Sequence, residues 1–564
     1  MEKIIIYQVF TRLFGNSKPT SVYNGSLQEN GCGKMAGFTN QALQEIKKLG
    51  TTHIWYTGVI AHATQTDYTA YGIPRNHPSI VKGKAGSPYA IRDYYDVDPD
   101  LAVNVNQRMK EFETLIERTH ANRLKVIIDF VPNHVSRQYQ SLAKPRKVKD
   151  LGETDNPNIA FSPDNNFYYI PGQKLEGEID LHNESMGDYY ESPAKATGNN
   201  RFDAYPNRND WYETVKLNYG TDYIHNTGNH FSPIPDTWHK MKDILLFWAG
   251  KGIDGFRCDM AEMVPCEFWG WAIPEVKAQY PNLIFIAEVY NPNEYRNYLF
   301  NGKFDYLYDK VGLYDTLRGV ICGYNSATAI TSCWQSVNDI QDHMLNFLEN
   351  HDEQRIASDF FAGNPFKALP ALIVSACMNT NPMMIYFGQE LGEPGMDEEG
   401  FSGRDGRTTI FDYWSVNSLY RWSNNGRYNT HLLSPKEKEL RKFYSRLLNL
   451  CNQEAALREG AFFDLMYVNQ GGWQMNEHRQ YAFLRKQENE VLLIAVNFDE
   501  TPAQVSINLP AHAFEYLNMP EYESITATNL LDSQKETISF TASKPVGITL
   551  PAYSGKILKI KIGK

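Results

Sequence analysis

Four short segments in the middle of the chain each carry a carboxylate at the end of a hydrophobic run. The four carboxylates are Asp129, Asp259, Glu288 and Asp352. Buried parallel strands are near-continuous apolar runs, and in a β/α barrel the chemistry lies where those strands end. A carboxylate in such a place is costly unless it faces a cleft or is paired. Four of them in order therefore predict an active site lined by carboxylates.

The elements that position these residues alternate between helix and strand over the first two-thirds of the chain. Thr39 is a predicted N-cap, Leu43 and Ile46 recur at helical spacing, and Gly50 is the expected glycine after the last turn. A strand at 53–56 follows, and the same order recurs further along the chain. We therefore predict parallel strands in a wound α/β sheet or a (β/α)8 barrel.

The segment 135–225 breaks this alternation. It is rich in Asn, Asp, Pro, Gly and Tyr, shows no sustained period, and is too long for an ordinary connecting loop. We predict an inserted subdomain after the third strand, between two parts of a barrel at 1–134 and 226–445. A long insertion on the catalytic face of a barrel usually builds substrate-binding walls.

The end of the chain has the pattern of a separate β domain. Ser434-Pro435 opens a helix, and short apolar strands separated by turn residues follow it, for example at 491–496. We predict a C-terminal antiparallel β-sandwich over 446–564.

Length, charge and cysteine content restrict the class of protein. A chain of 564 residues exceeds one ordinary core, so two or three domains are expected. The net charge of -11 argues against a general surface for nucleic acid or anionic membranes. The seven cysteines are scattered without a CxxC pair, which fits neither a disulfide framework nor a zinc site. Aromatic residues make up 13% of the chain, and such rings suit core packing or the stacking of sugars.

The N-terminal sequence carries no recognisable targeting signal. Its apolar run at 4–7 is too short for a signal-peptide core or a membrane span. We therefore expect a cytoplasmic protein without a membrane segment, although an exported protein whose signal has been removed would have the same sequence. Composition leaves the oligomeric state open.

The four segments resemble, in order and residue type, the four signature regions of the alpha-amylase superfamily of retaining glycoside hydrolases and transglycosylases. Asp129 with Asn133-His134 resembles the first region, Gly255–Asp259 the second, Glu288 the third and His351-Asp352 the fourth. The resemblance extends over roughly residues 1–440. It implies a (β/α)8 TIM barrel with a subdomain inserted after strand 3 and a C-terminal antiparallel β-sandwich.

The resemblance also implies a role for each carboxylate. Asp259 is the expected nucleophile, Glu288 the general acid/base and Asp352 a third carboxylate that orients sugar hydroxyls, while Asp129 braces the end of its strand. Such a pair breaks a glycosidic bond by protonating the leaving oxygen and attacking the sugar carbon. Glu288 must then hold a proton near neutral pH, and an apolar strand with two acidic neighbours favours this.

Four further residues are expected to bind substrate or support the carboxylates. His134 and His351 match histidines that bond to hydroxyls of the sugar beside the cleaved bond, and Tyr89 resembles the tyrosine that stacks under that sugar. Arg257 lies two residues before Asp259, so both side chains point to the same side of the strand. Its guanidinium is expected to keep the Asp259 carboxylate ionised.

Departures from the family pattern concern the leaving-group subsite and a metal. Glu262-Met263 stand where many family hydrolases carry Lys-His, and Ala90 stands where several exo-acting glucosidases carry an acidic residue. Asn133 matches a residue that ligates calcium in some members, yet no compact Asp/Asn loop of calcium type is present. We expect no required cofactor, with a structural calcium at Asn133 as the candidate metal site.

The resulting hypothesis is a retaining hydrolase that cleaves α-glucosidic bonds in α-glucans or maltooligosaccharides. A transglycosylase or isomerase with the same three carboxylates is the alternative, because a sugar then replaces water as acceptor. A non-catalytic carbohydrate-binding barrel is disfavoured because all three carboxylates are present. A metal-dependent hydrolase is disfavoured because the HxH spacing of such sites is absent.

Overall fold

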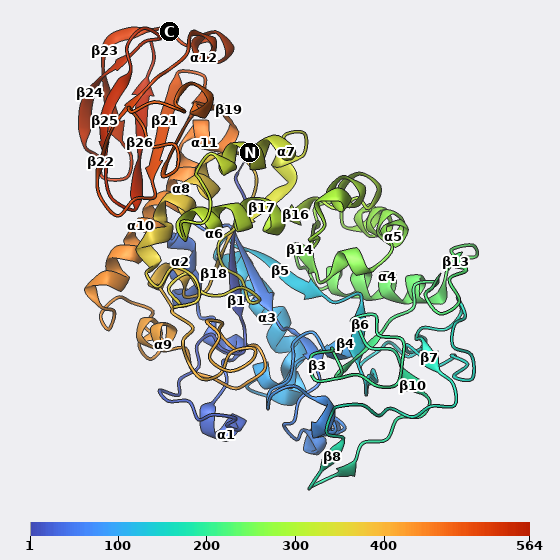
Figure 1. Cartoon of the computed structure of the whole chain (residues 1–564). Helices are drawn as coiled ribbons and strands as arrows, with labels where there is room; N and C mark the ends of the chain where they lie inside the picture. The colour runs from blue at the N-terminus through green and yellow to red at the C-terminus, as the bar shows by residue number, and fades with distance from the viewer. Residues whose placement is uncertain (1, 564) are drawn as a thin grey trace.

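The computed structural model describes residues 2–563, and within them eight parallel strands close a barrel in chain order (Figure 1). β1 pairs with both β2 and β18, which closes the ring. The strands are β1 (Ile5–Phe10), β2 (His53–Thr57), β5 (Lys125–Phe130), β14 (Gly255–Cys258), β15 (Ile284–Ala287), β16 (Tyr306–Tyr308), β17 (Met344–Phe347) and β18 (Met383–Tyr386). The barrel prediction is confirmed.

Helices connect these strands and cover the barrel. Those named α in the barrel part are α1 (Leu27–Asn30), α2 (Asn40–Lys48), α3 (Arg108–Ala121), α4 (Asp236–Ala249), α5 (Cys266–Gln279), α6 (Asp315–Ile321), α7 (Ala329–Ser336), α8 (Leu369–Cys377), α9 (Asn417–Ser423) and α10 (Pro435–Gln453). Local sequence explains two of the starts. The Thr39 side chain accepts from the Ala42 N–H at the start of α2, and Ser434 forms a capping box with Glu437 at the start of α10.

Two irregular segments lie on the loops that follow the second and third barrel strands. β3 (Ile60–His62) pairs with β4 (Ile91–Val97) in the first of them. The second separates β5 from α4 and holds β6 (His134–Ser136), β7 (Tyr169–Ile170), β8 (His182–Asn183), β9 (Gly187–Asp188), β10 (Ala194–Lys195), β11 (Thr214–Lys216), β12 (Thr221–Asp222) and β13 (Gly228–Asn229). β6 pairs with β11, so His134 lies opposite Lys216. This second segment occupies the predicted insertion and has a small apolar core of its own.

The C-terminal part is an antiparallel β domain at the opposite end of the molecule from the β8–β9 hairpin (Figure 1). Its elements are α11 (Ala455–Glu459), β19 (Ala461–Asp464), β20 (Gln480–Gln487), β21 (Glu490–Asn497), β22 (Ala503–Ile507), α12 (Ala511–Tyr516), β23 (Tyr522–Asn529), β24 (Lys535–Phe540), β25 (Val546–Leu550) and β26 (Ser554–Lys561). In the described chain, six of these strands form one sheet, and β22 pairs with β25 in a second. α10 runs across the predicted boundary at 445/446, because its apolar face packs continuously on the barrel.

A buried arginine joins this domain to the barrel. The Arg485 guanidinium on β20 donates to the Cys377 carbonyl at the end of α8 at 2.7 Å, and to the Gly460 carbonyl at 2.7 Å. α8 is apolar on all sides, as expected for a helix enclosed between the barrel and the β domain. Over residues 2–563, we find no helix that has the length and hydrophobicity to cross a membrane.

Candidate active site

Strand register brings the predicted carboxylates together. Arg257 on β14 lies beside Asp129 on β5 and beside Ile286 on β15. The Glu288 N–H donates to the Cys258 carbonyl at 3.1 Å, which continues that register one residue beyond both strands. Asp259 and Glu288 are therefore neighbours at the carboxyl ends of adjacent parallel strands, where barrel enzymes hold their chemistry.

Arg257 is the centre of this cluster. Its Nη1 lies 2.7 Å from Asp259 Oδ1 and 3.4 Å from Asp129 Oδ1, and its Nη2 lies 2.7 Å from Glu288 Oε2. Its Nε donates to the Tyr308 hydroxyl at 3.1 Å, and the side chain is fully buried. A guanidinium is suited to this place because its planar fork donates in several directions and keeps its charge when buried.

The residue after Asp259 aims a backbone donor at Glu288. Met260 has a φ of 41°, which is uncommon for a residue other than glycine. This left-handed turn places the Met260 N–H 2.8 Å from Glu288 Oε2. The second carboxylate oxygen, Oε1, accepts from the Tyr290 hydroxyl at 2.6 Å.

Asp352 lies in the loop that follows a third barrel strand, β17, beside a network of buried polar groups. His351 Nε2 lies 3.0 Å from Asp352 Oδ2 and 2.6 Å from the Tyr89 hydroxyl. Its Nδ1 lies 2.9 Å from Gln8 Nε2 on β1, so the ring is held from both sides. The Tyr89 and His351 rings stack with centroids 5.2 Å apart. This contact fixes the orientation of Tyr89 at the floor of the site.

His134 is placed by the inserted segment. Its ring centroid lies 5.3 Å from that of Trp211, and its Nδ1 lies 3.0 Å from Asn133 Nδ2. Gly198 lies so close that an added Cβ would be 3.0 Å from the His134 side chain and 2.5 Å from Thr214 Oγ1. The insertion thus packs its backbone directly against this histidine, and only glycine fits there.

These groups face one open cleft of about 1390 Å³. Of the predicted site residues, Tyr89, His134, Asp259, Glu288 and Asp352 line it. Arg257 and His351 are not among its lining residues and contact the lining carboxylates from beneath. The structure therefore divides the prediction into residues that face the cleft and residues that hold them.

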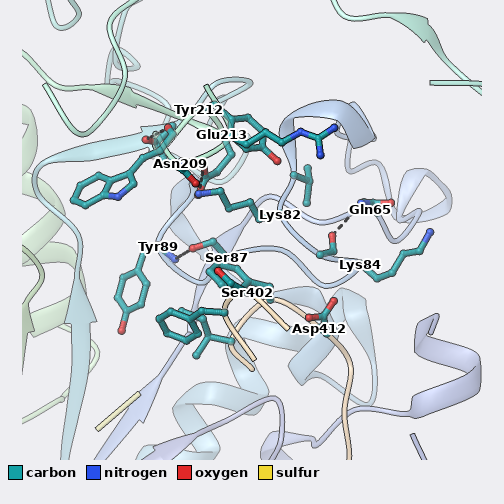
Figure 2. Close-up of a pocket in the computed structure, with 18 of the residues that line it drawn as sticks. Gln65, Lys82, Lys84, Ser87, Tyr89, Asn209, Tyr212, Glu213, Ser402 and Asp412 are labelled. Atoms are coloured by element: carbon teal, nitrogen blue, oxygen red, sulfur yellow. Dashed lines mark hydrogen bonds and ion pairs between the residues drawn. The ribbon is translucent and has the colours of Figure 1, made fainter. Parts of the chain in front are cut away.

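The walls of the cleft hold two charged residues, Lys82 and Glu213, that the sequence patterns did not single out. Figure 2 shows Lys82 beside Tyr212 and Glu213 on one wall, with Ser402 and Asp412 on the facing loop. Lys82 Nζ forms an ion pair with Glu213 at 3.2 Å and lies 5.2 Å from the centre of the Tyr212 ring. The loops that carry these residues come from segments far apart in the sequence, so no local pattern predicts that the residues meet.

The two departures from the family pattern lie apart from the cleft lining. Glu262 is not a lining residue, and its Oε2 accepts from the Asn291 N–H at 3.1 Å. Ala90 is buried in a small apolar cluster with Ala63 and Val81. Neither residue contacts the three carboxylates through an ion pair or hydrogen bond in residues 2–563.

Burial dominates the electrostatics of the site. It raises the pKa of Asp259 well above its ordinary value; Arg257 opposes this, and the Glu288 carboxylate adds to it. Burial lowers the pKa of His134 to about 3, with Lys216 adding to the effect, so this ring is neutral at physiological pH. A neutral imidazole can both donate to and accept from sugar hydroxyls.

The residues around Asn133 do not fit a calcium ion. Asn133 Oδ1 accepts from Lys216 Nζ, and the same Nζ donates to the Met263 carbonyl at 3.1 Å. Burial lowers the pKa of Lys216 to about 7, yet the amine donates to both oxygens in either protonation state. The described part of the chain also holds no group of three or more His, Cys, Asp or Glu side chains arranged to bind a metal. A hard cation needs several oxygen ligands, and here the amide oxygen is already taken.

Fold and site together define a glycosidase of the barrel class, because paired carboxylates at adjacent strand ends face a cleft large enough for several sugar units. A family model for the alpha-amylase catalytic domain matches residues 8–460, and one for the alpha-amylase C-terminal all-beta domain matches residues 473–561. The chain therefore belongs to the alpha-amylase family.

Individual relatives differ in their named activities. Alpha-amylase 2 of Dictyoglomus thermophilum is 21% identical over 90% of this chain and 71% of its own length. A cyclomaltodextrin glucanotransferase of Bacillus sp. (strain 38-2) is 25% identical over 47% of this chain and 31% of its own. The crystal structure of the maltogenic alpha-amylase AmyB from Thermotoga neapolitana has the same fold, with a TM-score of 0.64, 18% identity and 99% of both chains covered.

The raised pKa of Asp259 predicts that this carboxylate reduces stability as pH rises. Below about pH 4 the carboxyl is protonated in both the folded and the unfolded chain, so it does not reduce the free energy of unfolding. Above about pH 4 the carboxyl ionises more readily in the unfolded chain than in the folded one, which favours unfolding. We expect the free energy of unfolding of Asp259→Asn to exceed that of the parent by roughly 1 to 3 kcal/mol at about pH 8. At about pH 5 we expect a smaller difference. Thermal unfolding at both pH values measures this.

Asp243→Asn, an exposed carboxylate on α4, is the control and is expected to change the unfolding temperature little at either pH. An Asp259→Asn variant that is less stable than the parent at the higher pH would contradict the assignment of a costly buried charge.

The Lys216 contacts predict stability without calcium. We expect EDTA to leave the unfolding temperature unchanged, because Lys216 already occupies Asn133 Oδ1. We expect Lys216→Met to lose about 1 to 3 kcal/mol of unfolding free energy, since two buried oxygens lose their donor. Added calcium should not restore the loss. A drop in unfolding temperature of the parent protein with EDTA, reversed by calcium, would overturn this prediction.

Proposed function

We propose that this protein is a retaining glycoside hydrolase that cleaves α-glucosidic bonds in α-glucans or maltooligosaccharides. The observation that carries the proposal is the shared guanidinium, because Arg257 lies 2.7 Å from both Asp259 and Glu288. Two carboxylates bound to one guanidinium are close neighbours. Retaining enzymes hold their two carboxyl groups only about 5 to 5.5 Å apart, and inverting enzymes hold them further apart.

In the proposed mechanism, Glu288 donates its proton to the leaving glycosidic oxygen as the bond from that oxygen to the sugar carbon breaks. A carboxylate oxygen of Asp259 forms the new bond to this carbon and gives a covalent glycosyl-enzyme. Glu288, now ionised, then takes a proton from water while the water oxygen displaces Asp259. Two displacements at one carbon retain its configuration.

The cleft favours a neutral sugar chain over a charged polymer. Acidic residues that line it outnumber basic ones: the acids are Asp180, Glu213, Asp259, Glu288, Asp352, Glu399 and Asp412, and the bases are Lys82, Lys84 and Arg208. Negative potential in a cleft repels polyanions. Aromatic rings, among them Tyr89, Trp211 and Tyr212, lie among these charges and suit the apolar faces of pyranose rings. The volume exceeds that of a pocket for one small ligand.

Substitution of either carboxylate tests the assigned roles. We expect Asp259→Asn to reduce kcat on a maltooligosaccharide by at least about 10⁴-fold, and Glu288→Gln by about 10² to 10⁴-fold. Release of reducing sugar measures both, and circular dichroism checks that the variants are folded. Asp243→Asn is again the matched control, with activity close to the parent. Near-full activity in Asp259→Asn would refute its role as nucleophile.

The anomer of the first product tests the double displacement. We expect proton NMR of maltooligosaccharide hydrolysis to show the α-anomer before mutarotation, because two inversions restore the starting configuration. A β-anomer as first product would exclude the proposed mechanism. Chromatography of the same reaction separates hydrolysis from transfer, since products longer than the substrate indicate that a sugar replaced water as acceptor.

A further inference from the structure

The two oxygens of Glu288 have different partners. Oε2 accepts from the Met260 backbone N–H at 2.8 Å and lies 2.7 Å from Arg257 Nη2. Both partners can only donate, since neither a peptide N–H nor a guanidinium carries an acceptor lone pair. A proton on Oε2 would face the Met260 N–H and the positively charged guanidinium, neither of which can accept it, so this oxygen stays unprotonated in either state of the acid.

Oε1 has one partner of another kind. The Tyr290 hydroxyl lies 2.6 Å from it, and a hydroxyl can donate or accept. Tyr290 therefore donates to the ionised carboxylate and accepts from the protonated acid by rotation of one O–H bond. Burial and the Glu288 charge raise the pKa of Tyr290 well above its usual value, so the phenol itself stays protonated.

Tyr290 also lies where it can act during the reaction. It lines the cleft together with Glu288, Asp259 and Asp352. Its position two residues after Glu288 places it just beyond the end of β15. The contact is thus built into the wall of the active site itself.

We propose that Tyr290 is a positioning residue that directs the catalytic proton of Glu288 to Oε1. The partner of this oxygen is a hydroxyl, which can either donate or accept a hydrogen bond. This inference rests on the proposed function and adds the orientation of its acid. During glycosyl transfer to Asp259 the proton leaves Oε1 for the leaving oxygen as the glycosidic bond breaks, and the Tyr290 hydroxyl turns to donate to the new carboxylate. In the second half-reaction water returns a proton to Oε1, and the hydroxyl turns back to accept.

The variant Tyr290→Phe removes the hydroxyl and keeps the ring. We expect kcat/KM on maltotriose to fall about 10- to 100-fold, because the acid loses its orientation. On α-maltosyl fluoride, whose leaving group needs little protonation, we expect kcat/KM within about 2- to 3-fold of the parent. A purely structural role would affect both substrates alike.

A double-mutant cycle checks that Tyr290 acts through Glu288. In a Glu288→Gln background we expect Tyr290→Phe to change kcat/KM by less than about 3-fold, since no proton remains to be oriented. Tyr295→Phe is the matched control: this neighbouring tyrosine is buried, and its hydroxyl has no hydrogen-bond partner in the part of the chain that the structure describes. It should leave both substrates unaffected.

The outcomes separate the two proposals. If the parent protein turns over neither substrate, the proposed function fails. If the parent is active and Tyr290→Phe lowers kcat/KM equally on both substrates, the role assigned to Tyr290 is overturned. The same holds if Tyr290→Phe lowers kcat/KM as much in the Glu288→Gln background as it does alone. Equal activity of parent and Tyr290→Phe on maltotriose overturns it as well.

Discussion

The contact between Arg257 and its surrounding carboxylates is the interaction on which the rest of the site depends. One guanidinium lies within 2.7 Å of both Asp259 and Glu288 and within 3.4 Å of Asp129. Burying several carboxylates side by side is expensive, and a single cation offsets only part of that cost. The raised pKa of Asp259 shows that the balance is not fully restored. The barrel therefore has to hold this cluster by the combined rigidity of adjacent strands.

The inserted segment is fastened to the barrel by polar contacts close to the same cluster. Lys216 on β11 bonds to Asn133 at the end of β5 and to the Met263 carbonyl on the loop after Asp259. One amine thus joins the insertion to two barrel loops, at the place that was considered for a calcium ion. The pairing of His134 with Lys216 across β6 and β11 places both side chains in the same small region. The wall of the cleft and the carboxylate ends are consequently held by one continuous set of contacts.

Much of the architecture follows from local sequence. The caps at Thr39 and Ser434 determine where two helices begin, because each side chain satisfies a backbone N–H that the helix leaves free. Short apolar runs identify barrel strands, and at β14 and β15 the residues directly after the run, Asp259 and Glu288, mark the ends that carry chemistry. The period of two along β14 places Arg257 and Asp259 on one side of the strand, and the structure shows that contact at 2.7 Å. These features depend on residues a few positions apart, so the order of residue types is sufficient to predict them.

The contacts between distant segments were decided by tertiary structure. Lys216 and Asn133 lie 83 positions apart, and no local pattern predicts that an amine takes the place considered for a metal. Which oxygen of Glu288 meets Tyr290 depends on the left-handed turn at Met260 and on the register of β14 with β15. The sequence pattern alone thus determined alternating helices and parallel strands and the types of residue at the strand ends, and the family resemblance selected the barrel over a wound sheet. Only the folded chain determined which atoms face one another, because distances of 2.5 to 3 Å follow from strand register and from the path of the loops. The spacing of residues along the sequence does not directly encode either of these.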